Sequence, residues 1–358
     1  SCSDRYIHTR AGSKTYKDKF GPDIYCDFLI DHMKQHRDEP MMLYFPMALT
    51  HGPLVPTPDE PKVTTNKDKL KAMVRYTDTL VGRLVSTLDD LKIRDRTIVI
   101  FTTDNGTSGG MRGTVNGRRP SGGKGSKFEG GVCQPFIVNC PGLVPGGRET
   151  DALTDFSDLL PTFAELGGAK LPKGVTLDGR SFASLLLGQA DDSPRDWIMA
   201  LGHGAGRLDK KGVRGTNDFA DRVLRDKRHK VWLEHEPKIT ALYDLESDPL
   251  EQKNLLNSDK PEHLAALKKF RAIIGSQPKV DGRPLYRPRK ANSWDKQFQA
   301  NLEKPTSNKP KRERRRKRKA AQQLTACPRR RASRICPTAK SRANVFWPRA
   351  RRRSRTVN

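Results

Sequence analysis

Two short apolar runs flank one long segment of helical periodicity, and this order restricts the folds open to the chain. Residues 41–48 (MMLYFPMA) and 97–103 (TIVIFTT) are apolar and too short for typical helices, so both are interpreted as buried strands. Between them, residues 68–91 repeat apolar side chains on one helical face. Strand, helix and strand in this order predict a βαβ unit and an α/β fold with a mainly parallel sheet flanked by helices.

The pattern changes after residue 190. Before it, residues 135–140 predict a third strand and residues 155–168 a helix that ends at glycine. After it, short strand patterns follow one another without crossover helices, which predicts a small antiparallel sheet. These patterns lie at residues 197–201, 229–235 and 241–245, and a predicted helix follows at 261–274. We therefore expect an α/β domain over 1–190, an antiparallel subdomain over 191–276 and a disordered tail rich in Pro, Lys and Arg over 277–358.

Most of the positive charge lies in the tail. The 358 residues carry a net charge of +27, and residues 309–358 supply +19 of it, with 20 Lys and Arg against the single acid Glu313. Such a segment binds polyanions by charge alone, so a non-catalytic protein that binds nucleic acid or sulfated glycan is one alternative. Only Phe346 and Trp347 interleave the charges, and no nucleic-acid fold accompanies them. A charged, unstructured extension is the favoured interpretation, and an out-of-frame coding end is another.

The sequence contains no membrane-span or disulfide pattern. No apolar run approaches the ~18 residues of a membrane span, and residues 1–10 lack the order of a signal peptide. The chain opens with Ser1 instead of Met, which suggests that its true start is missing. The six cysteines form no CxxC pair, and no Cys pair has zinc-finger spacing. Three histidines are interpreted as exposed strand-face residues and not as ligands: His203, His229 and His235.

Asp104 and Asn105 directly follow the strand predicted at 97–103, at the edge where open α/β sheets bind ligands. A carboxylate and an amide oxygen are the ligands that Ca²⁺ prefers. A DNG sequence is more often a simple turn, but a hairpin turn needs a second strand at once. Here a glycine-rich loop over 106–131 follows instead, which favours the metal interpretation.

Two further candidates are cationic side chains on loops, and His51 would lie at the same sheet edge as Asp104. His51 follows the first predicted strand on a proline-stiffened loop, where a histidine bonded to the backbone is the plain alternative. Lys124 lies among Gly122, Gly123 and Gly125, whose small size suits an oxyanion held by the ammonium and nearby N–H groups. A solvated loop lysine is the alternative.

Seven segments in this order resemble the sulfatase family, the arylsulfatase-like branch of the alkaline-phosphatase superfamily, from about residue 20 to 257. They are HGPLVPTP, RYTDTLVGRLVSTLDDL, RTIVIFTTDNG, GGKGSKFEGGVCQPFIV, FSDLLPTFAELGG, LDGRSFASLLLG and ALYDLESDPLEQKNL. The resemblance implies an alkaline-phosphatase-like fold and hydrolysis of sulfate esters at a calcium site.

The resemblance also assigns residues to roles. Asp104 and Asn105 match the later pair of calcium ligands, His51 matches the histidine beside the sulfate, and Lys124 matches the lysine that contacts the sulfate oxygens. In this scheme, calcium and the two cations stabilise the charge that develops as the S–O bond breaks. Protonated His51 would donate to the leaving oxygen as general acid.

The nucleophile of the family is absent from the sequence. It is a formylglycine made from the Cys or Ser of a C-x-P-x-R or S-x-P-x-R motif, and neither motif occurs here. Cys133 and Pro135 begin such a motif, but Ile137 stands where arginine is required. We therefore expect the C-terminal part of a sulfatase, inactive alone.

The substrate and location are less constrained. Phosphate and phosphonate ester hydrolases share the metal-bearing sheet edge, so they remain an alternative. Aryl sulfates and carbohydrate sulfates both fit, and Arg112, Arg118 and Arg119 either meet an anionic substrate or are solvated. Family members are often exported, which implies a periplasmic or secreted location.

Overall fold

The computed structural model describes residues 3–281, with gaps at 10–11, 109–110, 112, 115–116, 118, 121, 203–206, 210–211 and 215–218. The described residues all fall within one compact unit, Ser1–Leu285. Several predictions concern residues outside this described part. They are the tail from residue 282 onward and the single residues Arg112, Arg118 and His203. Within the described residues, no helix has the length and apolarity needed to cross a membrane.

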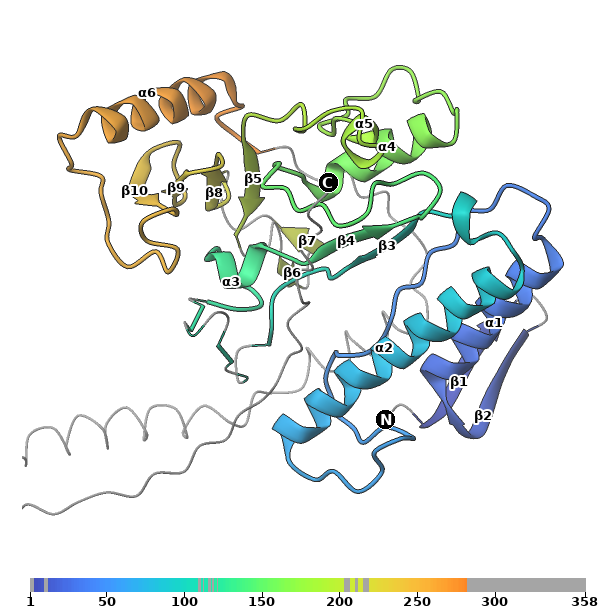
Figure 1. Cartoon of the computed structure of the whole chain (residues 1–358). Helices are drawn as coiled ribbons and strands as arrows, with labels where there is room; N and C mark the ends of the chain where they lie inside the picture. The colour runs from blue at the N-terminus through green and yellow to red at the C-terminus, as the bar shows by residue number, and fades with distance from the viewer. Residues whose placement is uncertain are drawn as a thin grey trace, which may run out of the picture. The chain divides into compact units, whose positions relative to one another are not determined.

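Two long helices, α1 (Gly21–Gln35) and α2 (Asn66–Asp90), pack side by side (Figure 1). The α2 helix begins where the Thr65 hydroxyl accepts a hydrogen bond of 3.1 Å from the backbone N–H of Asp68, which caps the first turn. Apolar side chains of both helices form one cluster with the loop before α2: Cys26, Leu49, Met73, Tyr76 and Leu80. The periodicity of residues 68–91 therefore predicted this helix to within two residues at its start and one at its end.

The first predicted strand does not form. Residues 41–48 are extended without strand pairing, although β3 (Val99–Thr102) forms as expected. β3 pairs antiparallel with β4 (Phe136–Asn139), and all strand pairs recorded among the described residues are antiparallel. The expected parallel pairing within a βαβ unit is therefore corrected. The physical reason is that a buried strand needs backbone partners on its edges, whereas Met42 and Tyr44 are 74% and 80% exposed.

The predicted C-terminal antiparallel sheet is present, with strand order β10–β9–β8–β5. Its strands are β5 (Ile198–Leu201), β8 (Arg222–Arg225), β9 (His229–Leu233) and β10 (Ile239–Asp244), and α6 (Pro261–Ser276) follows. α6 covers one face of the sheet (Figure 1), and both contribute to one apolar core. That core contains Leu224, Val231, Leu233, Leu242, Leu267 and Phe270.

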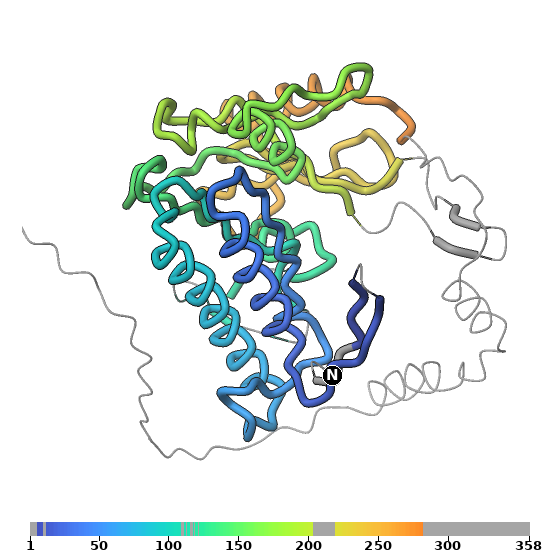
Figure 2. Tube along the Cα trace, turned by 90° about the vertical axis from the view of Figure 1, so that its right-hand side faces the viewer, coloured from blue at the N-terminus to red at the C-terminus, as the bar shows by residue number. Residues whose placement is uncertain are grey.

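Shorter elements complete the described chain. An N-terminal hairpin lies beside α1 (Figure 2), and a second hairpin precedes β8. These hairpins are β1 (Ser3–Thr9) with β2 (Gly12–Phe20), and β6 (Arg207–Asp209) with β7 (Gly212–Arg214). The short helices are η1 (Arg94–Arg96), α3 (Glu129–Val132), η2 (Phe156–Asp158), α4 (Leu159–Leu166) and α5 (Ala183–Leu186). Together η2 and α4 match the helix predicted over residues 155–168.

Candidate active site

The end of β3 presents Asp104 and Asn105 beside a second loop. Asp104 is exposed and Asn105 is half-buried. The Thr103 hydroxyl donates to Gln134 Oε1 at 2.7 Å, and the Gln134 amide donates to the backbone oxygen of Gly131 at 3.1 Å. These bonds tie the strand end to the chain that enters β4. The side-chain oxygens of Asp104 and Asn105 have no recorded protein partner within the described residues.

Backbone hydrogen bonds bring Lys124 to this strand end. The N–H of Lys124 donates to Thr107 O at 2.9 Å, and the N–H of Gly106 donates to Gly131 O at 3.1 Å. Lys124 itself occupies a tight turn, closed by a 2.9 Å bond from Ser126 N–H to the oxygen of Gly123. The structure thus brings together the segments of Asp104, Asn105 and Lys124, whose roles the family resemblance alone assigned.

Glycines allow this close approach. A Cβ atom on Gly106 would lie 1.9 Å from the backbone oxygen of Gly130, and one on Gly123 would lie 2.7 Å from Thr107 O. Gly125, with a φ of +81°, occupies the turn position that requires a left-handed backbone. The glycines around Lys124 are therefore required by the packing of the two segments as well as by the turn.

His51 lies on a separate segment and is exposed. Its Nδ1 is 2.7 Å from the oxygen of Gly52. Because a carbonyl oxygen only accepts, Nδ1 carries the proton of this bond and Nε2 is the nitrogen left for another partner. In the described part of the chain, no recorded hydrogen bond joins His51 to the Asp104 or Lys124 segments.

A buried charged network lies directly behind the Lys124 turn, and the sequence analysis missed it. The Lys230 ammonium, fully buried, lies 2.9 Å from Glu129 Oε1 and 3.1 Å from Glu251 Oε1. Arg225 pairs with the other oxygen of Glu129 at 2.5 Å, and the indole N–H of Trp232 donates to Glu251 Oε2 at 3.1 Å. These bonds fasten the chain after Lys124 to the C-terminal sheet, across the boundary predicted near residue 190. The available signal was a lysine within the apolar strand pattern HKVWL.

The cysteine that begins an incomplete formylglycine motif has a poor environment for a nucleophile. Desolvation by the surrounding chain and then the Glu129 carboxylate raise the pKa of the Cys133 thiol. A raised pKa lowers the thiolate fraction at neutral pH. We therefore do not assign the role of nucleophile to Cys133.

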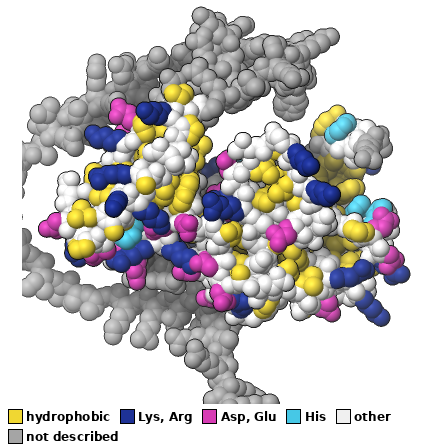
Figure 3. All heavy atoms as spheres, turned by 90° about the horizontal axis from the view of Figure 1, so that it is seen from above, with side chains coloured by type: hydrophobic (Ala, Val, Ile, Leu, Met, Phe, Trp, Pro, Cys, Tyr) yellow, Lys and Arg dark blue, Asp and Glu magenta, His cyan; other side chains and the backbone are white. Residues whose placement is uncertain are grey.

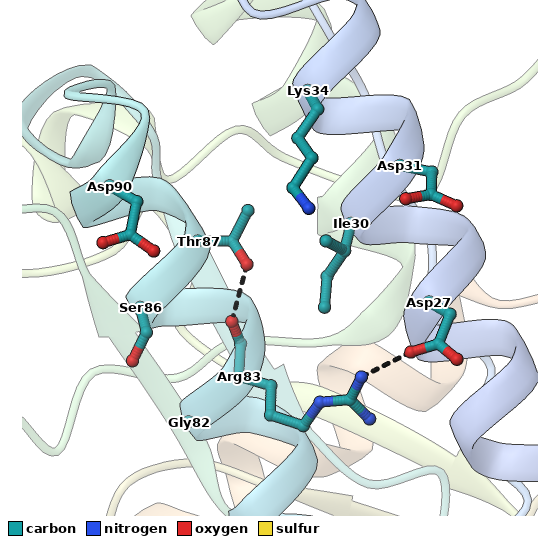
Figure 4. A pocket seen from close by; sticks show the side chains of 9 residues that line it. All are labelled: Asp27, Ile30, Asp31, Lys34, Gly82, Arg83, Ser86, Thr87 and Asp90. Atoms are coloured by element: carbon teal, nitrogen blue, oxygen red, sulfur yellow. Dashed lines mark hydrogen bonds and ion pairs between the residues drawn. The ribbon is translucent and has the colours of Figure 1, made fainter.

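A cleft of about 740 Å³ opens elsewhere, between α1 and α2 (Figure 4). Its acidic and basic side chains partly neutralise one another, since Arg83 pairs with Asp27. The lining is Asp27, Ile30, Asp31, Lys34, Gly82, Arg83, Ser86, Thr87 and Asp90. None of the residues predicted for catalysis lies in this cleft, so we interpret it as a groove between two helices.

Two family profiles match the chain. The profile of the Sulfatase family matches residues 8–169, and a profile described as the C-terminal part of N-sulphoglucosamine sulphohydrolase matches residues 124–273. Both matches include the turn that carries Lys124. The chain belongs to the sulfatase family.

Individual relatives agree with this assignment. Arylsulfatase A of Homo sapiens is 33% identical over 259 residues, which cover 67% of this chain and 49% of the relative. N-acetylgalactosamine-6-O-sulfatase of Bacteroides thetaiotaomicron is 29% identical over 260 residues, which cover 69% of this chain and 50% of the relative. The chain therefore spans about half the length of the curated relatives it matches.

Solved structures confirm the alkaline-phosphatase-like fold. The PsFucS1 sulfatase from Pseudoalteromonas sp. superposes with a TM-score of 0.54 at 22% identity, over 73% of this chain and 54% of that one. The protein Ps i-CgsB, in complex with k-i-k-neocarrahexaose, gives a TM-score of 0.59 at 23% identity, over 75% of this chain and 58% of that one. At these identities the likeness shows the fold alone.

Proposed function

We propose that this chain carries the calcium-binding and sulfate-binding part of a sulfuric ester hydrolase. Two backbone hydrogen bonds give the main support: the N–H of Lys124 donates to Thr107 O, and the N–H of Gly106 donates to Gly131 O. They hold the Lys124 turn beside the strand end that carries Asp104 and Asn105. An anion-binding cation and two oxygen ligands for a hard metal ion then lie on adjacent segments.

The residues present fit part of a calcium site. Asp104 offers a carboxylate and Asn105 an amide oxygen, and their side chains have no recorded partner among the described residues to compete with a cation. Bound Ca²⁺ would act as a Lewis acid that neutralises charge on the sulfate oxygens. Ca²⁺ takes six to eight oxygen ligands, so two residues supply a minority of them.

Two cationic side chains would act on the ester. The exposed Lys124 ammonium would hold sulfate oxygens, since its turn leaves the side chain free of recorded partners in the described chain. His51, with its Nδ1 proton held by Gly52 O, would present Nε2 to the leaving oxygen and donate a proton from it. No residue of this chain fits the family's formylglycine, so no covalent step is assigned to it.

The substrate class is a sulfate ester, and relatives favour a sulfated sugar. One relative is named N-acetylgalactosamine-6-sulfatase, and the structural neighbour Ps i-CgsB was solved in complex with k-i-k-neocarrahexaose. Arylsulfatase A is also among the relatives. We propose carbohydrate sulfates as substrates, with aryl sulfates as the second candidates.

Calorimetric binding of inorganic sulfate to the full chain tests the assignment. We expect part of the binding to require Ca²⁺ and to be lost in Lys124→Ala and Asp104→Ala, with Lys170→Ala and Asp259→Ala as exposed controls. The basic tail is unchanged in all four variants, so the amount of sulfate that it binds should be the same in each. Calcium-dependent binding that both site variants retain would contradict the proposal. Turnover of an aryl sulfate by the chain alone, above that of Asp104→Ala, would contradict the absence of a nucleophile.

A second candidate function, polyanion binding, is supported by the charge of residues 309–358. On the face in Figure 3, Lys and Arg side chains are scattered among Asp and Glu, so this face offers no single basic patch. We expect salt-sensitive retention on heparin that is lost when residues 309–358 are deleted. Unchanged retention after the deletion would exclude the tail as the binding element.

A further inference from the structure

Three metal-ligating side chains converge in the C-terminal subdomain, away from Asp104 and Asn105 in sequence. His229 is the first residue of β9 and lies opposite Asp244, the last residue of β10. His263 lies in the first turn of α6, which packs on the same sheet. Each residue offers one ligand atom, and these atoms all lie within 4.8 Å of one another. Cross-strand pairing and helix packing therefore bring two imidazoles and a carboxylate to one point.

The sequence analysis placed His229 on an exposed strand face, and the structure corrects this. β9 is covered on both faces, because Val231 and Leu233 pack in the core with α6 while Lys230 contacts Glu129 and Glu251. His229 is only 8% exposed, and its ring lies 6.0 Å from that of His263 between centroids.

One nitrogen of this cluster lacks a partner. His229 Nε2 is buried and has no hydrogen-bond partner among the residues that the structure describes. A polar atom left unsatisfied in the interior costs about 1–3 kcal/mol, so such atoms in native proteins call for an explanation. A bound cation would account for the orphan nitrogen.

Outer contacts orient the other two ligands. His263 Nδ1 is 2.7 Å from the Ser258 hydroxyl, which fixes the ring in its plane. Asp244 accepts a 3.2 Å bond from the backbone N–H of Glu246, which holds the carboxylate in place. Metal-binding histidines and carboxylates usually have such partners.

We propose that His229, Asp244 and His263 bind one divalent transition-metal ion of the Zn²⁺ class, and that this ion fastens the start of α6 to the β9–β10 hairpin. Two imidazoles with one carboxylate are a set that Zn²⁺ accepts, with water in the fourth position. Ligand bonds of about 2.0–2.2 Å require the three ligand atoms to close in by roughly 1 Å. Ca²⁺ does not suit this set, since it prefers six to eight oxygens.

Arg228 competes with the ion for Asp244. Its guanidinium donates to Asp244 Oδ2 at 2.9 Å and to Oδ1 at 3.2 Å. Glu246 Oε2 lies 3.4 Å from the same guanidinium and offers it a second anion. The other nearby acid, Asp226, pairs with Lys269 and accepts the backbone N–H of His229. Metal binding therefore requires Arg228 to give up one bond to Asp244 while it keeps Glu246.

The test is a titration of the full chain, first stripped with a chelator, with Co²⁺ as a spectroscopic substitute. We expect one Co²⁺ per chain with the intense visible absorption of a four-coordinate or five-coordinate ion, displaced by Zn²⁺. A near-ultraviolet thiolate band should be absent, which excludes cysteine ligands. A folded chain, by circular dichroism, that gives only the weak spectrum of octahedral Co²⁺ overturns the proposal whatever the variants do.

Matched histidine variants locate the ion. His263→Gln and Asp244→Asn should each weaken Co²⁺ binding at least tenfold. The double variant His32→Asn/His36→Asn should bind as the wild type does. It is the matched control because those two rings lie 4.3 Å apart on α1, where they form the other histidine pair of the described residues with metal-binding spacing. The reverse result, binding lost in the α1 double variant and kept in His263→Gln, would assign the ion to α1 and reject our site.

Thermal unfolding with and without Zn²⁺ tests the same metal site independently. An ion that binds only the folded chain raises the melting temperature, and the rise grows with the logarithm of the ion concentration divided by its dissociation constant. Zn²⁺ should raise the melting temperature of the wild type and leave that of His263→Gln unchanged. An equal shift in both proteins would contradict the proposal.

Discussion

Glu251 accepts a hydrogen bond from the backbone N–H of Glu129 at 2.7 Å, although 122 residues separate them. The same carboxylate oxygen also accepts from the buried ammonium of Lys230 at 3.1 Å. Glu129 begins α3, a few residues after the Lys124 turn, so this contact fixes the position of that turn against the C-terminal sheet. The segment SDPLEQKNL, which contains Glu251, thus helps to position the candidate site through its contact with Glu129.

Removal of Glu251 should therefore destabilise the fold strongly. Glu251→Ala leaves the Lys230 charge buried with one carboxylate in place of two, and breaking a buried ion pair costs about 3–5 kcal/mol. Glu251→Gln keeps the shape and should cost less. Urea unfolding of the full chain measures both, with the exposed Glu236→Gln as control. A change below about 0.5 kcal/mol for Glu251→Ala, the range of ordinary surface substitutions, would show that the network is not formed.

Gly106→Ala should disturb the junction between the strand end and the Lys124 turn. The added Cβ would lie 1.9 Å from the oxygen of Gly130, so the backbone bond from Gly106 to Gly131 must lengthen. Overpacking of this kind typically costs about 1–3 kcal/mol. Gly146→Ala is the matched control, since nothing lies within 4 Å of its Cβ position. Denaturant unfolding should separate the two variants, and equal stabilities would contradict the close approach.

Periodicity in the sequence predicted two of the long helices, α2 and α6, well. α2 and α6 lie within two residues of their predicted bounds at both ends, because one-faced apolar spacing is a local property. Residues 41–48 have an equally strong strand pattern but form no strand, because a strand also requires a partner edge that the pattern does not specify.

Contacts distant in sequence explain what was missed at the site. The family resemblance assigned Asp104, Asn105 and Lys124 to one site, and backbone bonds join their segments. Lys230 could not be assigned, because its partners lie 101 and 21 residues away. The functional roles of Asp104, Asn105 and Lys124 are still predictions, which the sulfate-binding and calcium-binding experiments test.

The ion pair of Asp244 with Arg228 should make the stability of the C-terminal subdomain sensitive to acid. The hydrogen bonds from the Arg228 guanidinium hold the pKa of Asp244 far below its usual range. Because the folded-state pKa lies below the unfolded value of about 3.9, the stabilisation is complete at about pH 5 and above. It is lost as the pH falls from there toward the folded-state pKa.

The expected signature is a pH-dependent difference between wild type and Asp244→Asn. The difference in free energy of unfolding should be largest near pH 7 and should shrink progressively below about pH 5. Unfolding by urea at several pH values, with chelator present to exclude metal ions, measures it. Asp259→Asn, at an exposed position, should show no such trend. A difference that stays constant from pH 7 to pH 3 would contradict the lowered pKa.

Gly82→Ala should stabilise the helical pair. Gly82 lies inside α2, is exposed in the cleft between α1 and α2 (Figure 4), and has nothing within 4 Å of its Cβ position. Alanine in a helix interior is more favourable than glycine by about 0.5–1 kcal/mol, because glycine loses more backbone freedom on folding. Gly275→Ala, at the last turn of α6, should gain less because helix ends fray. Thermal unfolding of both variants ranks the gains, and a lower melting temperature for Gly82→Ala would mean that the cleft is too narrow for a methyl group.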